Sequence, residues 1–156
     1  MTFDFKKYQE QALTTALPSA LTMDYLAPGL IAELGEVFGK QAKAVRDGWD
    51  EERLNREVCA ELGDCLWFLA LIGHVTDSEP TGFFYCQNLQ DAMYAAVCLL
   101  DYAPSSYRRY LGRVFRQIEK EAEAHGSTLE AVAQANLDKL ASRQARGVLG
   151  GSGDTR

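Results

Sequence analysis

The hydrophobic positions along this chain recur at helical spacing almost from end to end. In the first segment Phe5, Tyr8, Ala12 and Leu13 fall on one face of a helix, which Pro18 cannot continue. No segment shows the alternation of apolar and polar residues, rich in β-branched side chains, that is typical of a strand. The pattern therefore predicts an all-α fold, a bundle of about six helices.

The helix boundaries are predicted from the residues that start and stop helices. Pro28 is tolerated in a first turn, Asp50 is a good N-cap, and Gly73 and Gly126 are expected to end helices. Ser127-Thr128-Leu129-Glu130 has the form of a capping box. The helices are expected at 3–17, 28–47, 51–73, 86–101, 105–125 and 127–143.

The third of these helices is apolar in every direction around its axis. From Val58 to Ile72 its only charged residues are Glu61 and Asp64. Such a helix is expected to be buried on most sides. An unpaired buried carboxylate costs several kcal/mol, so these two acids are predicted to have a partner, a proton or a metal ion.

A pentapeptide repeat extends this prediction to the second helix. Ala-Glu-Leu-Gly-acid occurs at 32–36 and at 60–64, and each copy places two carboxylates three residues apart on one helix face. If the two helices pack antiparallel, four acids converge: Glu33, Glu36, Glu61 and Asp64. Four carboxylates repel one another unless a cation lies among them, and an oxygen-only ligand set suits Mg²⁺ or Mn²⁺ rather than zinc.

Each pentapeptide also contains a glycine in mid-helix, Gly35 and Gly63. Such a glycine costs roughly 0.5–1 kcal/mol relative to alanine. We expect both at a close approach of the two helices, although both could be merely tolerated.

The neighbours of the four acids leave alternatives open. Glu57 precedes Glu61 by one turn and is either a further ligand, a base for water or a surface residue. Glu36 and Lys40 are four residues apart and can form a surface ion pair.

Composition limits the class of protein. The 156 residues are 47% hydrophobic and 24% charged, as expected for one globular domain, here predicted at 1–146. The net charge of −6 argues against nucleic-acid binding. No run reaches the roughly 18 apolar residues of a membrane span, the start lacks a signal-peptide pattern, and the four cysteines form no C-x-x-C pair. A cytoplasmic protein is predicted, with a flexible glycine-rich tail at 147–156.

These motifs resemble a known family. Glu33-x-x-Glu36, then 24 residues, then Glu61-x-x-Asp64 resembles the E-x-x-E…E-x-x-D signature of the MazG-like, all-α nucleoside triphosphate pyrophosphohydrolases. The stretch 136–143, Asn-Leu-Asp-Lys-Leu-Ala-Ser-Arg, is similar to the family's closing N-x-x-K-L-x-x-R element. The resemblance covers the second, third and last helices, about half of the chain.

The resemblance implies Mg²⁺-dependent hydrolysis of a nucleoside triphosphate between the α- and β-phosphates, by a homodimer or a higher homo-oligomer. It implies that the four motif acids hold the metal and that Glu36 or Glu57 acts as base. The residues expected to bind substrate are Lys40, Asn136, Lys139 and Arg143. An ordinary polar face on a terminal helix is the alternative for the last three.

Two features depart from the family pattern. Ala32 stands where many members have an outer glutamate, and the segment 74–126 adds about two helices that either cover the site or build a subunit interface. The substrate is also open between canonical nucleotides, dUTP, dCTP and a phosphoribosyl-nucleotide. A non-catalytic helical interaction domain is a further alternative, whereas a di-iron bundle would need Glu-x-x-His pairs that the chain lacks.

Overall fold

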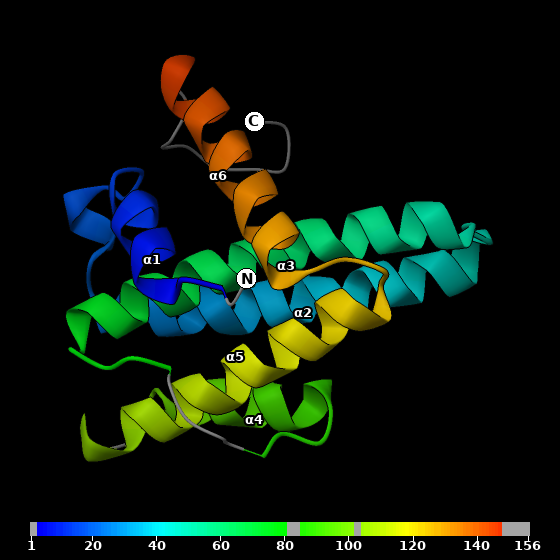
Figure 1. The fold of residues 1–156 in the computed structure, drawn as a ribbon. Coiled ribbons are helices and arrows are strands. Elements are labelled where there is room, and N and C mark those ends of the chain that lie inside the picture. Colours follow the sequence, from blue (N-terminus) through cyan, green and yellow to red (C-terminus); the bar gives the residue numbers. More distant parts are fainter. Residues whose placement is uncertain (1–2, 81–84, 102–103, 148–156) are drawn as a thin grey trace.

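The computed structural model describes residues 3–80, 85–101 and 104–147. These ranges contain α-helices and two 3₁₀ turns, η1 and η2, and no strand (Figure 1). The all-α prediction is confirmed. The elements are α1 (Phe5–Leu13), η1 (Pro18–Ala20), α2 (Met23–Asp47), α3 (Glu51–Val75), α4 (Leu89–Cys98), η2 (Pro104–Ser106), α5 (Tyr107–Ala124) and α6 (Leu129–Ala145).

Helix α3 forms the centre of the molecule, because α1, α2, α5 and α6 all pack against it. Between Leu62 and Gly73 only Asp64 and Trp67 are partly exposed, and all other residues are buried. The prediction of a helix buried on most sides is therefore confirmed. By length and composition α3 could also cross a membrane, but 61% of its apolar window is buried inside the bundle. The core helix of a bundle passes the same test, so this feature alone does not identify α3 as a membrane span.

Helices α2 and α3 form an antiparallel hairpin (Figure 1). Gly48 ends α2 in the left-handed conformation, at φ 64°, and its N–H donates to the carbonyl of Ala44. Asp50 then starts α3, with its side chain accepting a hydrogen bond of 2.8 Å from the N–H of Arg53. This tight connection places the two acid-bearing stretches beside each other.

The other helices cover two sides of this hairpin. Helices α4 and α5, which come from the segment 74–126, pack on α2 and α3 respectively and on each other. Helix α6 runs steeply across α3, with α1 beside it (Figure 1). The site lies on this α1–α6 side.

Two predicted helix ends in the N-terminal part are wrong. The first helix stops at Leu13 rather than at residue 17, because the hydroxyls of Thr14 and Thr15 bond the carbonyls of Gln11 and Ala12, each at 2.7 Å. Helix α2 begins at Met23, so Pro28 lies inside it rather than at its start. A proline inside a helix removes one intrahelical hydrogen bond.

Three other boundaries also differ from prediction. Helix α3 passes through Gly73 to Val75, and α4 is shorter than expected because Asn88 caps it. Thr128, not Ser127, is the N-cap of α6, accepting from the N–H of Ala131 at 3.2 Å. The N-cap is therefore displaced by one residue, and because Ala131 then occupies the third helical position, the predicted capping box with Glu130 does not form. The predicted tail lies outside the described residues, except for Gly147.

A prediction follows from Gly29, where α2 touches the core. A Cβ built on Gly29 would lie 2.2 Å from Cε1 of Phe68, a buried ring that packs edge-on against Trp67. We expect Gly29→Ala to lower the free energy of unfolding by about 2 kcal/mol, measured by urea titration. Gly39→Ala is the matched control in the same helix, since its Cβ would meet only the Glu36 carboxylate at 3.9 Å. Equal stability of the two variants would contradict the packing argument.

Candidate metal centre

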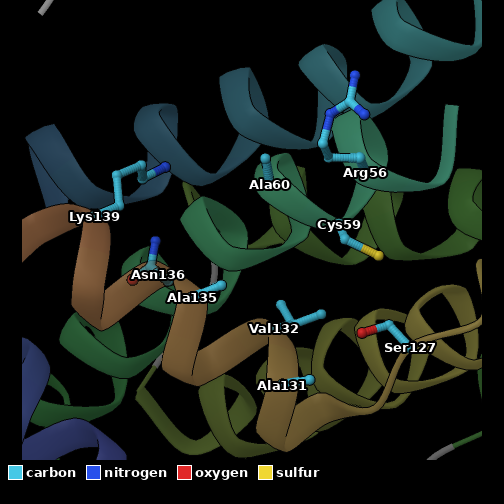
Figure 2. A pocket seen from close by; sticks show the side chains of 9 residues that line it. All are labelled: Arg56, Cys59, Ala60, Ser127, Ala131, Val132, Ala135, Asn136 and Lys139. Carbon is cyan, nitrogen blue, oxygen red and sulfur yellow. The ribbon is translucent and has the colours of Figure 1, made fainter. Parts of the chain in front are cut away.

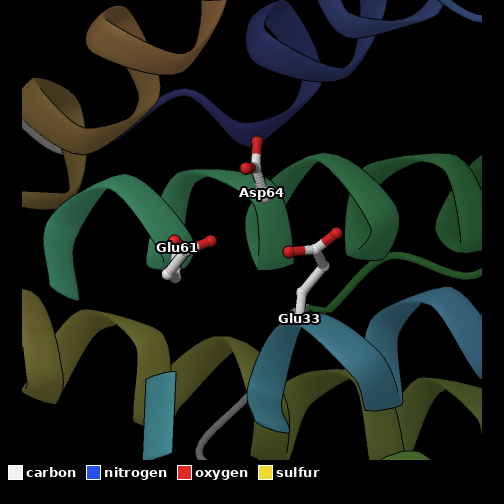
Figure 3. Close-up of side chains that lie close together, drawn as sticks. All are labelled: Glu33, Glu61 and Asp64. Carbon is white, nitrogen blue, oxygen red and sulfur yellow. The ribbon is translucent and has the colours of Figure 1, made fainter. Parts of the chain in front are cut away.

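Three of the four predicted acids come together between α2 and α3. Glu33 of α2 and Glu61 and Asp64 of α3 each offer a carboxylate oxygen, and these oxygens lie within 4.8 Å of one another. Figure 3 shows Glu33 rising from α2 toward the acids of α3. All three side chains are partly buried. The antiparallel hairpin thus brings these three acids together, as the pentapeptide repeat predicts.

Asp64 is the most highly connected of the three acids. Nζ of Lys139 lies 2.5 Å and 2.6 Å from its two carboxylate oxygens. Nδ2 of Asn136 donates to Oδ1 of Asp64 at 2.8 Å. Both partners come from α6, so two residues predicted to bind substrate contact a predicted metal ligand here. Lys139 remains 30% exposed and can still be reached from solvent.

Glu61 shares the ammonium group of Lys40 with Glu57. Nζ of Lys40 lies 3.1 Å from Glu61 and 3.0 Å from Glu57, so one lysine of α2 bridges two acids of α3. The predicted surface pair of Lys40 with Glu36 is not what forms. The hydrogen bond from Lys40 also lowers the pKa of Glu57. Glu57 is thus held in an ion pair beside the three acids and is not one of them.

Glu33 differs from the other two acids because no described residue forms a hydrogen bond or ion pair with its carboxylate. Burial raises the pKa of Glu33 to about 7, with further contributions from the charges of Asp64 and Glu61. The charge of Lys139 lowers it by a smaller amount. Half-buried and next to two other acids, Glu33 is the group that most lacks a cation.

Two details of the predicted acid cluster are wrong. Glu36 is exposed and does not join the three acids, although its charge adds to the raised pKa of Glu33. Gly35 is also exposed, and a Cβ there would meet nothing within 4 Å, so it marks no helix contact. Gly63 does mark one, but with α6: its Cβ would lie 3.0 Å from Cβ of Asn136. The repeat therefore has different surroundings in its two copies.

Two cavities flank this group of residues. The larger, about 390 Å³, lies between α3 and α6, and Figure 2 shows Arg56 of α3 and Lys139 of α6 among the residues around it. The smaller, about 240 Å³, has both Glu33 and Asp64 in its wall. Among the described residues none from α4 or α5 lines either cavity, so these helices are not a cover for the site.

The smaller cavity combines acids, aromatic side chains and a cation. Tyr25, Trp67 and Phe68 line it together with Arg143, the fourth residue predicted to bind substrate. Nε1 of Trp67 donates to Oγ1 of Thr15 at 3.0 Å, which holds the indole against α1's end. Trp49, in contrast, lies under the guanidinium of Arg53 and lines neither cavity.

Sequence reasoning missed one residue of this network. Tyr8 was expected only as part of the apolar stripe of α1, yet its hydroxyl donates to Oδ1 of Asn136 at 3.0 Å. Burial and the charge of Asp64 raise the pKa of Tyr8, so the hydroxyl stays protonated. A tyrosine on a buried face usually needs a hydrogen-bond partner, and this was the signal available in the sequence.

The donor set fits a hard divalent cation. It consists of carboxylate oxygens alone, from Glu33, Glu61 and Asp64, and no cationic side chain among the described residues forms an ion pair with Glu33. With Glu57 included, four carboxylates face the ammonium groups of Lys40 and Lys139 and the guanidinium of Arg56, which lies 3.9 Å from Glu57, so the formal charge is −1. A divalent cation would neutralise this remaining negative charge.

Comparison with known proteins adds a relative but no activity. No family model matches the chain, and no solved structure matches it. The chain is 28% identical over 158 residues to "Gene 37 protein" of Mycobacterium phage L5, covering 96% of each chain. The match therefore includes the segment 74–126, and the similarity is to a phage protein whose name states no function.

Proposed function

We propose that the chain hydrolyses a nucleoside triphosphate between its α- and β-phosphates, with Mg²⁺ or Mn²⁺ held by Glu33, Glu61 and Asp64. The observation that supports this most is the convergence of three carboxylates within 4.8 Å, one of which has no partner among the described residues. A divalent cation in such a site neutralises phosphate charge and lowers the pKa of a bound water. The motif resemblance supplies the reaction class.

The phosphates are proposed to bind along the partly exposed face of α6 that carries Lys139 and Arg143. Lys139 presents a partly exposed ammonium group next to Asp64, and Arg143 lies one turn further along the helix, in the wall of the smaller cavity. A guanidinium and an ammonium group at this spacing can contact two phosphate groups of one nucleoside triphosphate. Lys40, in contrast, is engaged by Glu57 and Glu61, so its proposed contribution is to hold Glu61 in place.

The nucleobase of the substrate is proposed to enter the smaller cavity. Its wall contains Tyr25, Trp67 and Phe68, whose aromatic faces suit stacking on a planar heterocycle, and its acids join it to the metal centre.

Glu36 is the better of the two candidate bases. Glu57 is bound to Lys40, which lowers its pKa and makes it a weak proton acceptor. Glu36 is exposed one turn from Glu33 and has no ion pair with a described residue. We therefore assign proton acceptance from the attacking water to Glu36.

The decisive experiment offers the purified chain and Mg²⁺ a panel of canonical and modified (d)NTPs, including dUTP and dCTP. Pyrophosphate and a nucleoside monophosphate are expected in equal amounts, and EDTA should stop the reaction. Glu61→Gln should lose turnover with its helical circular dichroism unchanged, while Glu10→Gln, an exposed acid of α1, should behave as wild type. Orthophosphate as the first product would exclude cleavage between the α- and β-phosphates.

A non-catalytic helical domain is the second candidate. The observation that favours it is that Lys40 and Lys139 already neutralise Glu61 and Asp64 without any metal. This candidate predicts no release of pyrophosphate from any nucleotide in the panel and no binding of Mn²⁺. The nucleotide panel tests the first of these outcomes, and a titration with Mn²⁺ tests the second.

A homodimeric or higher state and a cytoplasmic location stay predictions. Light scattering on the purified chain tests the first, with a mass of at least twice 17.3 kDa expected.

A further inference from the structure

A buried chain of hydrogen bonds connects α1 to the metal centre. The hydroxyl of Tyr8 donates to Oδ1 of Asn136 at 3.0 Å, and Nδ2 of Asn136 donates to Oδ1 of Asp64 at 2.8 Å. Tyr8 and Asn136 are both 3% exposed. The chain joins residues 8, 64 and 136, which lie on three different helices, and no equivalent chain among the described residues reaches Glu33 or Glu61.

The backbone is shaped to admit this chain. Gly63 precedes Asp64 on α3, and a Cβ there would lie 3.0 Å from Cβ and 3.3 Å from Nδ2 of Asn136. Only a glycine therefore lets the Asn136 side chain lie in this position without displacement. The amide is bounded by Gly63 on one side and held by hydrogen bonds at both of its polar ends.

The orientation of the amide matters for the carboxylate that it contacts. With Tyr8 donating to Oδ1, the NH₂ group must face Asp64, where it can donate to a negatively charged oxygen. Without the hydroxyl, Oδ1 would be a buried acceptor with no donor, a cost that a side chain relieves by rotating toward water. Such a rotation would remove the hydrogen bond that Asp64 receives.

We propose that Tyr8 is a positioning residue of the metal centre, which acts through Asn136 to hold the carboxylate of Asp64 in the orientation that binds a divalent cation. The inference rests on the proposed metal site and extends it to α1, outside the part of the chain that carries the motifs. Residues that orient metal ligands in this way typically contribute about 10–100-fold to metal affinity.

The test measures Mn²⁺ binding directly, from the electron paramagnetic resonance signal of free Mn²⁺, with the full chain. Tyr8→Phe removes one hydroxyl and keeps the ring, and we expect it to raise the Kd for Mn²⁺ about 10-fold. Gln9→Met is the matched control. Like Tyr8→Phe, it removes a hydrogen bond from α1 to another helix, here the one from Nε2 of Gln9 to the carbonyl of Ala70 on α3 at 2.9 Å, but this bond does not lead to the acids.

A purely structural role for Tyr8 predicts a different result. In that case Tyr8→Phe and Gln9→Met would lower the urea midpoint and leave the Kd for Mn²⁺ within about twofold of wild type, which would overturn the proposal. Tyr8→Phe in an Asn136→Ala background adds a second criterion. If Tyr8 acts through Asn136, its replacement should change the Kd no further there. A full additional 10-fold loss would show that Tyr8 acts by another route.

The outcome is separable from the assay of turnover. Mn²⁺ binding that depends on Tyr8, in a chain that hydrolyses no nucleotide, would retain the positioning role and reject the proposed reaction. A wild-type chain that binds no Mn²⁺ would reject the positioning role.

Discussion

Glu33→Gln is expected to abolish metal-dependent turnover and, at the same time, to stabilise the metal-free protein. Turnover should fall about 1,000-fold or more, equivalent to about 4 kcal/mol of transition-state stabilisation, because the variant loses the one acid of the centre that has no competing lysine. Stability should rise because the neutral amide ends the repulsion from Asp64 and Glu61 and the cost of burying a charge.

The stability effect of Glu33→Gln has a defined pH window. The pKa of Glu33 rises from 4.5 in the unfolded chain to about 7 in the folded one, so between these values the folded state holds a proton that the unfolded state releases. The contribution of the protonated Glu33 carboxyl group to the stability of the wild-type protein is complete below pH 4.5 and is lost as the pH rises through 7. At full burial this shift would correspond to roughly 3 kcal/mol, but the side chain is partly exposed, so we expect about 1 kcal/mol.

Urea titrations in EDTA at pH 5 and pH 8 test this. The gain of Glu33→Gln over wild type should appear at pH 8 and be largely absent at pH 5. In separate titrations without EDTA, Mg²⁺ should stabilise wild type but not the variant. Glu10→Gln, an exposed acid without a partner role, serves as control at both pH values. A destabilised Glu33→Gln at pH 8 would show that Glu33 has a favourable partner in the metal-free protein.

Asp64→Asn is expected to lose turnover by a similar factor but to change stability in the opposite direction. Asp64 receives Nζ of Lys139 at 2.5 Å and 2.6 Å and the amide of Asn136 at 2.8 Å. Removing its charge leaves a partly buried ammonium group without its carboxylate and brings two amide groups into competition. We expect the free energy of unfolding at pH 8 to fall by about 2 kcal/mol.

The double variant Asp64→Asn with Lys139→Met separates the loss of the ion pair from other causes of the lower free energy of unfolding. Because it removes both charges, it should recover part of the stability that Asp64→Asn loses. If Asp64→Asn were instead as stable as Glu33→Gln, the lysine contact would have no energetic weight. Measuring the two acid variants side by side thus tests whether the centre contains one unpaired and one paired carboxylate.

Much of the fold follows from local chemistry that can be recognised in the sequence. Helical spacing of apolar residues predicts the helices, the all-round apolar surface of 58–72 predicts a central helix, and the Gly48 and Asp50 pair marks the turn of the hairpin. The convergence of Glu33 with Glu61 and Asp64 follows from that hairpin and a repeat within it. The helices and the turn between them are set by residues within one or two turns of one another, and the short connection then fixes how the two acid-bearing stretches pair.

The remaining features depend on which side chains meet across helices. Nothing near Lys40 in sequence indicates that it bridges Glu57 and Glu61 rather than pairing with Glu36. The pentapeptide places Gly35 and Gly63 alike, yet only Gly63 faces another helix.

The contacts of α1 and α6 with the site illustrate the same limit. Tyr8 and Asn136 are 128 residues apart in the chain, and their hydrogen bond exists because α1 and α6 pack side by side over α3. Periodicity assigns a residue to a face of its own helix, but the partner of that face is set by how the helices stack. The sequence therefore specified the helices and a cluster of four acids, of which the structure brings together all but Glu36. The packing of α1 and α6 on α3 selected the partners of Asp64 and left Glu33 without one among the described residues.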